Sequence, residues 1–199
     1  MISDVWAAVP VKEFAGAKQR LSPLLTVEQR RALAAAMLED VLAALAAAPL
    51  AGIMVNTLDP LASELARRYD ARVVTDGARD GHTGAVAAMA RILADEGRAA
   101  MLAVPGDIPR ATAAEIAAVV AARRPAPSLT IVPAHDERGS NAVLCSPPIH
   151  PQRRHVPGFM ASLGRGASIL TGAVGRFADV GERSAHILAE DPIMDVGSE

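Results

Sequence analysis

The chain has 199 residues, of which 51% are hydrophobic, 21% are charged and 3% are aromatic, and its formal net charge is −2. This length suits one well-packed domain and is short for two. The slight negative charge argues against a general nucleic-acid binder, and so few aromatic residues leave no platform for stacking single-stranded bases. We therefore expect a single domain over residues 1–199 whose partner is a small molecule rather than nucleic acid.

The single cysteine, Cys145, follows three apolar residues and has no partner for an internal disulfide. We expect a small buried hydrophobe there rather than a catalytic thiol, and a reducing cytoplasm as the compartment. The first residues lack the basic region of a secretory signal, and an uncharged run over residues 41–55 is broken by Pro49 and Gly52. The sequence thus predicts neither export nor a membrane span.

Strand-like and helix-like segments alternate along the first part of the chain. Residues 5–11 predict a first strand, and a Thr-x-x-Gln capping box at 26–29 opens a helix to about residue 47. A second strand is expected over 53–57. Asp59 is then a plausible N-cap with Pro60 at the first helical position, which predicts a helix to about residue 69 and a third short strand over 71–74.

The same alternation continues further along the chain. A polar, glycine-containing loop over 75–83 precedes an apolar helix expected from Gly84 to Glu96, and 99–104 is a buried strand. A second capping box starts a helix at Thr112, and 129–133 and 142–146 are the last expected strands. The alternation is typical of the α/β class, and we predict a three-layer α/β/α domain with a mostly parallel sheet.

The first strand runs directly into a basic loop (residues 12–20) that contains the three cations Lys12, Lys18 and Arg20. These cations are spaced too irregularly for one helix face, but they are close enough to converge on a single anion. We interpret Gly16 as the residue that lets the loop turn where a side chain would obstruct it. Open α/β sheets bind ligands at the carboxyl ends of their strands, so the loop predicts a polyphosphate site. The alternative is a solvated connection with ordinary surface lysines.

Asp107 is the strongest acidic candidate because it lies on a Pro-Gly-Asp turn just after a predicted central strand. A carboxylate in that place can hold a divalent metal against phosphate oxygens, or it can satisfy its own turn. Asp76 and Asp80 are more typical of turn formers. The histidines have no zinc-ligand spacing, and no phosphate-loop or dinucleotide motif is present. A basic cluster at 153–155 could bind an anionic second substrate or remain a solvated loop.

Four segments occur in one order along about three quarters of the chain: Val9–Leu21, Gln29–Leu45, Val104–Pro109 and Gly139–Leu144. Together they resemble the guanylyltransferases that make the phospholactate-type precursor of the deazaflavin coenzyme F-420. This family belongs to the nucleotidyltransferases with a glycosyltransferase-A-like Rossmann fold. The resemblance therefore implies a single Rossmann-like nucleotidyltransferase domain.

The family joins the phosphate of 2-phospholactate, phosphoenolpyruvate or 3-phosphoglycerate to the α-phosphorus of GTP and releases pyrophosphate. The resemblance therefore implies GTP and a small phosphorylated carboxylic acid as partners, Mg²⁺ as the cofactor, and Lys18 and Asp107 as the catalytic residues. Homodimers are common among its members. The implied binding residues are Val11, Lys12, Lys18, Arg20, Gly81, Thr83 and Asp107 for the nucleotide, Ser140, Asn141 and Gly158 for the acceptor, and Asp107 and Asp179 for the metal.

The chain departs from the family pattern at three places. Residues 81–85 are Gly-His-Thr-Gly-Ala where the family commonly has Gly-Leu-Asn-Ala-Ala near the base pocket. Residues 155–160 lack the serine of Phe-Gly-x-x-Ser-Phe, and 179–182 keep one aspartate of an Asp-x-Asp-Thr-Pro metal segment. Residues 147–199 are thus a divergent C-terminal part of the same domain. Two alternatives follow: a nucleotidyltransferase with another base or acceptor, similar to the molybdopterin nucleotidyltransferases, and a nucleotide-binding homologue without turnover.

Overall fold

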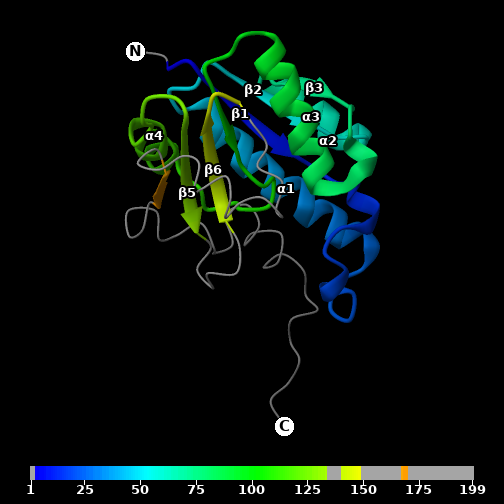
Figure 1. The fold of residues 1–199 in the computed structure, drawn as a ribbon. Helices are drawn as coiled ribbons and strands as arrows, with labels where there is room; N and C mark the ends of the chain where they lie inside the picture. The colour runs from blue at the N-terminus through cyan, green and yellow to red at the C-terminus, as the bar shows by residue number, and fades with distance from the viewer. Residues whose placement is uncertain (1–2, 134–139, 149–166, 170–199) are drawn as a thin grey trace.

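Figure 1 shows a computed structural model that describes residues 3–133, 140–148 and 167–169. Within these ranges, seven strands form one sheet in the order β3-β2-β1-β4-β6-β5-β7. The strands are β1 (Val5–Pro10), β2 (Gly52–Asn56), β3 (Arg72–Val74), β4 (Ala100–Ala103), β5 (Ser128–Pro133), β6 (Ser140–Ser146) and β7 (Ala167–Ile169). The helices are α1 (Val27–Ala46), α2 (Pro60–Arg68), α3 (Gly81–Asp95) and α4 (Ala113–Ala121), with 3-10 turns η1 (Phe14–Gly16), η2 (Gln19–Leu21) and η3 (Ala78–Asp80).

The sheet is mostly parallel, as the alternation of strands and helices predicted. β1 pairs in parallel with both β2 and β4, and β2 pairs in parallel with β3. β6 is antiparallel to its neighbours β4 and β5, whereas β7 runs parallel to β5. The sequence did not predict β7, which has only three residues. The parallel pairing of β1 with β4 brings the segments that follow these two strands to the same edge of the sheet.

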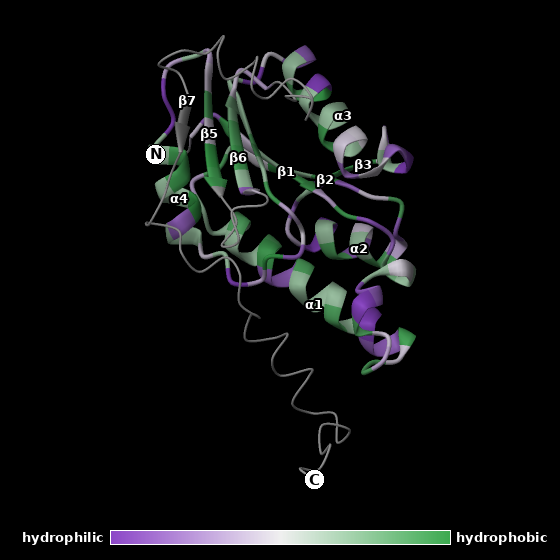
Figure 2. Cartoon of the chain, turned by 60° about the horizontal axis from the view of Figure 1, so that its bottom comes forward, coloured by the Kyte–Doolittle hydropathy of each residue, from purple (hydrophilic) through white to green (hydrophobic). Residues whose placement is uncertain are grey.

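Helices cover both faces of the sheet in three layers. Figure 2 shows α1, α2 and α4 on one face and α3 on the other. Alternate residues of β1 pack on opposite faces of the sheet. Val5, Ala7 and Val9 belong to the core under α1, α2 and α4, whereas Ala8 belongs to the smaller core under α3. The predicted three-layer architecture is therefore confirmed, and its central strand is buried on both faces.

Local capping chemistry sets the starts of three helices. Both hydrogen bonds of the predicted capping box are present at Thr26, and a second box is present at Thr112. Asp59 caps α2, with Pro60 in the first turn, as expected. These three helix starts are confirmed.

The predicted start of the third helix was wrong. α3 begins at Gly81 rather than Gly84, so Gly81 and Thr83 belong to its first turn and not to a loop. A Cβ added at Gly84 would lie 2.3 Å from the Cβ of Asp80. Gly84 is therefore a packing residue inside the helix, pressed against the η3 turn, although glycine in a sequence usually indicates a loop.

Two smaller expectations can be compared with the structure. Cys145 is buried, with 2% of its surface exposed, as predicted for a small hydrophobe. In the part of the chain that the structure describes, no helix combines the length and apolar character that crossing a bilayer requires. Most of the divergent C-terminal part, residues 147–199, lies outside the described residues.

Candidate active site

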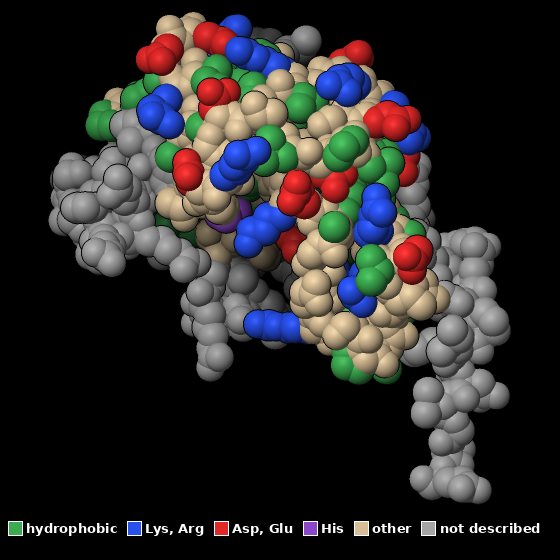
Figure 3. Space-filling model, turned by 90° about the vertical axis from the view of Figure 1, so that its right-hand side faces the viewer, with side chains coloured by type: hydrophobic (Ala, Val, Ile, Leu, Met, Phe, Trp, Pro, Cys, Tyr) green, Lys and Arg blue, Asp and Glu red, His purple; other side chains and the backbone are tan. Residues whose placement is uncertain are grey.

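A pocket of about 430 Å³ opens where β1 and β4 end. On the face shown in Figure 3, Lys and Arg side chains border a hollow in which histidine surface is visible. The pocket walls come from the end of β1 and the basic loop, from Ala34 of α1, from His82 of α3, and from the turn at residues 105–107. Its volume falls in the range of small-molecule sites. The predicted position, at the carboxyl ends of parallel strands, is therefore where the pocket lies.

Lys18 and Asp107 meet across this pocket. The Nζ atom of Lys18 lies 3.0 Å from the Oδ2 atom of Asp107, which is 89 residues away in sequence. The Lys18 side chain is 24% exposed and that of Asp107 is 59% exposed. Ion pairs at this degree of exposure contribute only about 0–1 kcal/mol to stability. The Lys18–Asp107 pair therefore contributes little to the stability of the fold.

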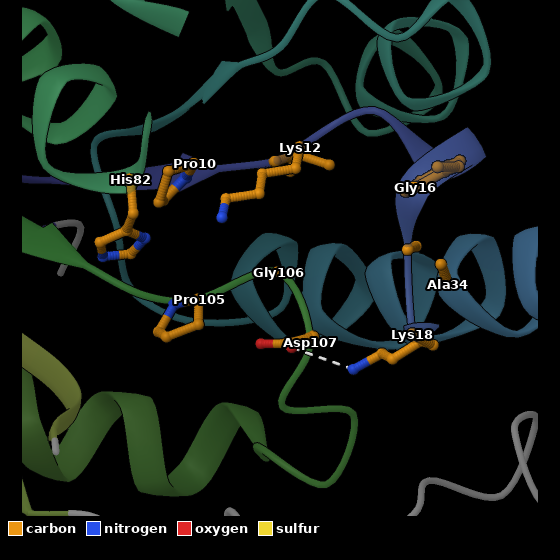
Figure 4. A pocket seen from close by; sticks show the side chains of 12 residues that line it. Pro10, Lys12, Gly16, Lys18, Ala34, His82, Pro105, Gly106 and Asp107 are labelled. Carbon is orange, nitrogen blue, oxygen red and sulfur yellow. Dashed lines mark hydrogen bonds and ion pairs between the residues drawn. The ribbon is translucent and has the colours of Figure 1, made fainter. Parts of the chain in front are cut away.

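Lys18 also has an unusual backbone. Its φ of 51° and ψ of 40° lie in the left-handed helical region. Residues with a Cβ pay roughly 1–2 kcal/mol to adopt this conformation, and such residues cluster at functional sites. The strained backbone is the one that points the Lys18 amine at Asp107 in Figure 4.

The pocket has two chemically different ends. Figure 4 shows the Lys18–Asp107 pair at one end, and His82 beside Pro10 and Pro105 at the other. The amine of Lys12 points into the space between them. The pocket can therefore hold an elongated ligand that is anionic at one end and less polar at the other.

Close packing positions the turn that carries Asp107. A Cβ added at Gly106 would lie 3.1 Å from Cγ2 of Val11 and 3.2 Å from Cδ1 of Leu38. A side chain at position 106 would force Val11 or Leu38 to move by a few tenths of an ångström, so glycine favours the close approach of this turn to the end of β1 and to helix α1. The carboxylate of Asp107 is held against the basic loop because its neighbour has no side chain.

The interpretation of Gly16 was wrong. A Cβ added at Gly16 would meet no atom within 4 Å, and its φ is not in the left-handed region. The left-handed residue of the basic loop is Lys18 instead. Nothing in the local space requires a glycine at position 16.

The structure brings some of the predicted site residues together. Val11, Lys12, Lys18 and Asp107 line the pocket. Arg20 is exposed on η2, and Gly81 and Thr83 flank the pocket residue His82 in the first turn of α3, but these three do not line the pocket themselves. Ser140 and Asn141 begin β6. Gly158 and Asp179 lie outside the described residues.

Sequence reasoning missed His82 as a pocket residue. The available signal was its place between Gly81 and Thr83, in the segment that the family resemblance put near the base pocket. Zinc-ligand spacing among the histidines gives no indication of a residue that lines a pocket with no metal-ligand cluster among the described residues.

The donor set fits a magnesium ion that arrives with a phosphate ligand. Asp107 contributes a single exposed carboxylate to the pocket, and no group of three His, Cys, Asp or Glu residues suited to a metal occurs among the described residues. Mg²⁺ is usually held by one or two carboxylates together with substrate phosphates and water. One carboxylate beside two lysines is therefore sufficient for a metal–triphosphate complex, and insufficient for a metal held by protein alone.

A cationic loop thus faces a carboxylate across a pocket at the carboxyl edge of a three-layer sheet. This arrangement is typical of α/β proteins that bind nucleotides or other phosphorylated ligands. The chain belongs to the family of MobA-like NTP transferase domains, whose model matches residues 23–173.

Two relatives refine this result. The chain is 38% identical over 143 residues to phosphoenolpyruvate guanylyltransferase of Roseiflexus sp. (strain RS-1) and 37% identical over 148 residues to the protein of the same name in Rubrobacter xylanophilus. The alignments cover 72% and 73% of this chain. The resemblance drawn from the four sequence segments is thus confirmed. The chain spans 63% of the Roseiflexus protein, less than two thirds of its length, and 70% of the Rubrobacter protein.

A solved structure agrees on the fold. The crystal structure of 4-diphosphocytidyl-2C-methyl-D-erythritol synthase aligns with a TM-score of 0.57 and 14% identity, over 94% of this chain and 98% of that one. At this identity the likeness concerns the fold alone, and it supports the predicted nucleotidyltransferase fold class.

Proposed function

We propose that the protein is a guanylyltransferase that transfers GMP from GTP to the phosphate of a small phosphorylated acid in coenzyme F-420 biosynthesis. The acceptor is phosphoenolpyruvate, 2-phospholactate or 3-phosphoglycerate, and the name of the two relatives favours the first of these. The observation that carries the proposal is the Lys18–Asp107 pair across a pocket into which Lys12 also points. As a proposal from the same family, the protein works in the cytoplasm, where a buried thiol such as that of Cys145 stays reduced.

The residues in the pocket suit this reaction. The second pKa of a phosphate monoester is near 6, so the phosphate of the acceptor is largely a dianion at neutral pH and needs no general base. One of its oxygens attacks the α-phosphorus of GTP and forms a new phosphoanhydride. The bond from the α-phosphorus to its bridging oxygen breaks, and pyrophosphate leaves with the electron pair. Such a transfer depends on in-line placement and on neutralising phosphate charge.

The chain's own cations supply part of that neutralisation. Lys12 and Lys18 would bind the phosphates of GTP, and Asp107 would hold Mg²⁺, which screens the negative charge on the triphosphate. The 3.0 Å ion pair between Lys18 and Asp107 would then be replaced by two new contacts, in which the amine binds a phosphate and the carboxylate binds the cation. Arg20, which is exposed on η2, is a proposed contact of the outer phosphates, and Ser140 and Asn141 are proposed acceptor contacts.

The experiment is pyrophosphate release by the purified protein, with GTP, ATP, CTP and UTP each crossed against the three acceptors in MgCl₂. We expect release with GTP and one of the phosphorylated acids. Release with another nucleotide in preference to GTP would point to a different nucleotidyltransferase, of the molybdopterin kind. If calorimetry shows that GTP binds, but no acceptor leads to pyrophosphate release, the protein is a nucleotide-binding homologue without turnover.

A further inference from the structure

Asp59 makes a contact that its role as a helix cap does not require. Its carboxylate is buried, with 5% of the residue exposed, and accepts three backbone hydrogen bonds. Oδ1 accepts the N–H groups of Leu61 (2.9 Å) and Ala62 (3.1 Å) and so caps α2. Oδ2 accepts the N–H of Phe14 at 2.8 Å, from a residue 45 positions earlier in the chain. One carboxylate oxygen therefore caps α2, and the other accepts a hydrogen bond from the basic loop.

Phe14 lies between the two pocket lysines, Lys12 and Lys18. Its side chain is 3% exposed and belongs to the main core, where η1 contacts α1. Its carbonyl accepts the N–H of Ala17 at 3.0 Å, which closes the turn that leads to Lys18. The Phe14 N–H and side chain thus anchor the middle of the loop, while Lys12 and Gly16 on either side are exposed.

This anchor bears directly on the strained residue of the pocket. A left-handed backbone at a residue other than glycine persists only when the surrounding structure holds it there. Only three residues separate Lys18 from the anchored Phe14, so a loop released from Asp59 can relax the Lys18 backbone and withdraw its amine from Asp107. The loss of a buried N–H partner is large enough to drive such a change.

We propose that Asp59 is a positioning residue for the nucleotide site. Through the Phe14 N–H it holds the basic loop where the amines of Lys12 and Lys18 face the pocket. Asp59 does not itself line that pocket, and acts only through the loop backbone. The inference rests on the proposed function, because it assigns the loop to nucleotide phosphates.

The decisive variant is Asp59→Asn. Asparagine has the size of aspartate and caps helices equally well, but the NH₂ group that replaces Oδ2 is a donor facing the Phe14 N–H donor. Asp59→Ser is the second variant, because serine also caps a helix but is too short to bond both α2 and Phe14. The matched control is Ser63→Ala, which removes the 2.9 Å hydrogen bond from Ser63 Oγ to the Asp59 carbonyl at the same helix start and leaves Phe14 bonded.

The first readout needs no nucleotide. Trypsin cuts after lysine and arginine, so native-state cleavage after Lys12, Lys18 and Arg20, followed by mass spectrometry, reports how often the loop opens. We expect cleavage roughly tenfold faster in both Asp59 variants, with the control at the wild-type rate. The second readout is kinetic: the KM for GTP should rise roughly tenfold, while the KM for the acceptor stays the same.

Each outcome decides the proposal. Wild-type cleavage and an unchanged KM for GTP in both Asp59 variants would overturn it. Equal acceleration of cleavage in Ser63→Ala would also overturn it, because the effect would then belong to the start of α2 as a whole. If the wild-type protein neither binds nor uses GTP, the proposed function fails, and the cleavage rates alone still show whether Asp59 holds the loop.

Discussion

Lys18 combines a strained backbone with a charged group directed at Asp107, at one end of the pocket. The two properties can be separated by substitution, because Lys18→Ala removes the amine but keeps a Cβ in the left-handed region, whereas Lys18→Gly removes both. We expect both variants to bind GTP roughly 10–100-fold more weakly, as the loss of a charge-assisted hydrogen bond implies. The glycine variant should be more stable than the alanine variant by about 1 kcal/mol.

Calorimetry gives the GTP affinities, and urea unfolding gives the two stabilities. Equal stabilities of Lys18→Gly and Lys18→Ala would argue against a left-handed, strained backbone at position 18. Unchanged GTP affinity would remove Lys18 from the phosphate site.

Asp107 is the other residue whose role can be isolated. Its side chain is 59% exposed and, among the described residues, its ion pair is with Lys18, so Asp107→Asn should change the free energy of unfolding by less than about 1 kcal/mol. Pyrophosphate release in MgCl₂ should nevertheless fall by about 100-fold or more, because the carboxylate proposed to hold the cation is gone. A variant that keeps the wild-type rate over a MgCl₂ titration would exclude Asp107 from metal binding.

At the scale of the element, the turn after β4 depends on a missing side chain. Gly106→Ala would place a Cβ against Val11 and Leu38, and Leu38 is fully buried in the core and cannot move freely. Overpacking of this kind costs about 1–3 kcal/mol, so we expect a lower free energy of unfolding and a displaced Asp107. Gly16→Ala is the matched control for stability, because its Cβ meets nothing within 4 Å.

Urea unfolding of the two glycine variants measures this difference. If Gly106→Ala is as stable as Gly16→Ala, the turn can shift without cost, and close packing does not explain the position of Asp107.

The elements that sequence could predict are those set by neighbouring residues. Thr26 with Gln29, and Asp59 with Pro60, fix helix starts through contacts within a few positions. The start of α3 was missed because it depends on Gly84 packing against η3, where glycine serves close contact rather than a turn. The bond from Asp59 to Phe14 was also missed, since it joins residues 45 positions apart. Capping chemistry is local, whereas loop anchoring is tertiary.

At the scale of the whole molecule, the alternation of strands and helices was enough to predict the sheet and the edge where the pocket lies. The basic loop and Asp107 lie at the same edge because they follow β1 and β4, which are parallel neighbours in the sheet. His82, at the end opposite Lys18, was missed because it reaches the pocket from the first turn of α3, a turn that the sequence predicts as part of a loop.

Carboxyl groups in separate parts of the molecule link stability to pH. The hydrogen bond from Arg123 lowers the pKa of Asp4, and that from Arg72 lowers the pKa of Glu96. In the folded protein these groups therefore bind protons less readily than in the unfolded chain. Their contribution to stability is complete above the unfolded pKa values, near pH 4–5, and is lost as the pH falls through the folded values.

Urea midpoints measured from pH 7 to pH 3 should therefore decline below about pH 5. Glu96→Gln removes one of the titrating groups, so its midpoint should lie below that of the wild type at pH 7 and approach it as Glu96 becomes protonated at pH 3. Arg72→Met should reproduce this behaviour, because it removes the donor that lowers the pKa of Glu96. A deficit that persists undiminished at pH 3 in both variants would show that packing, and not the ionised pair, links β3 to the end of α3.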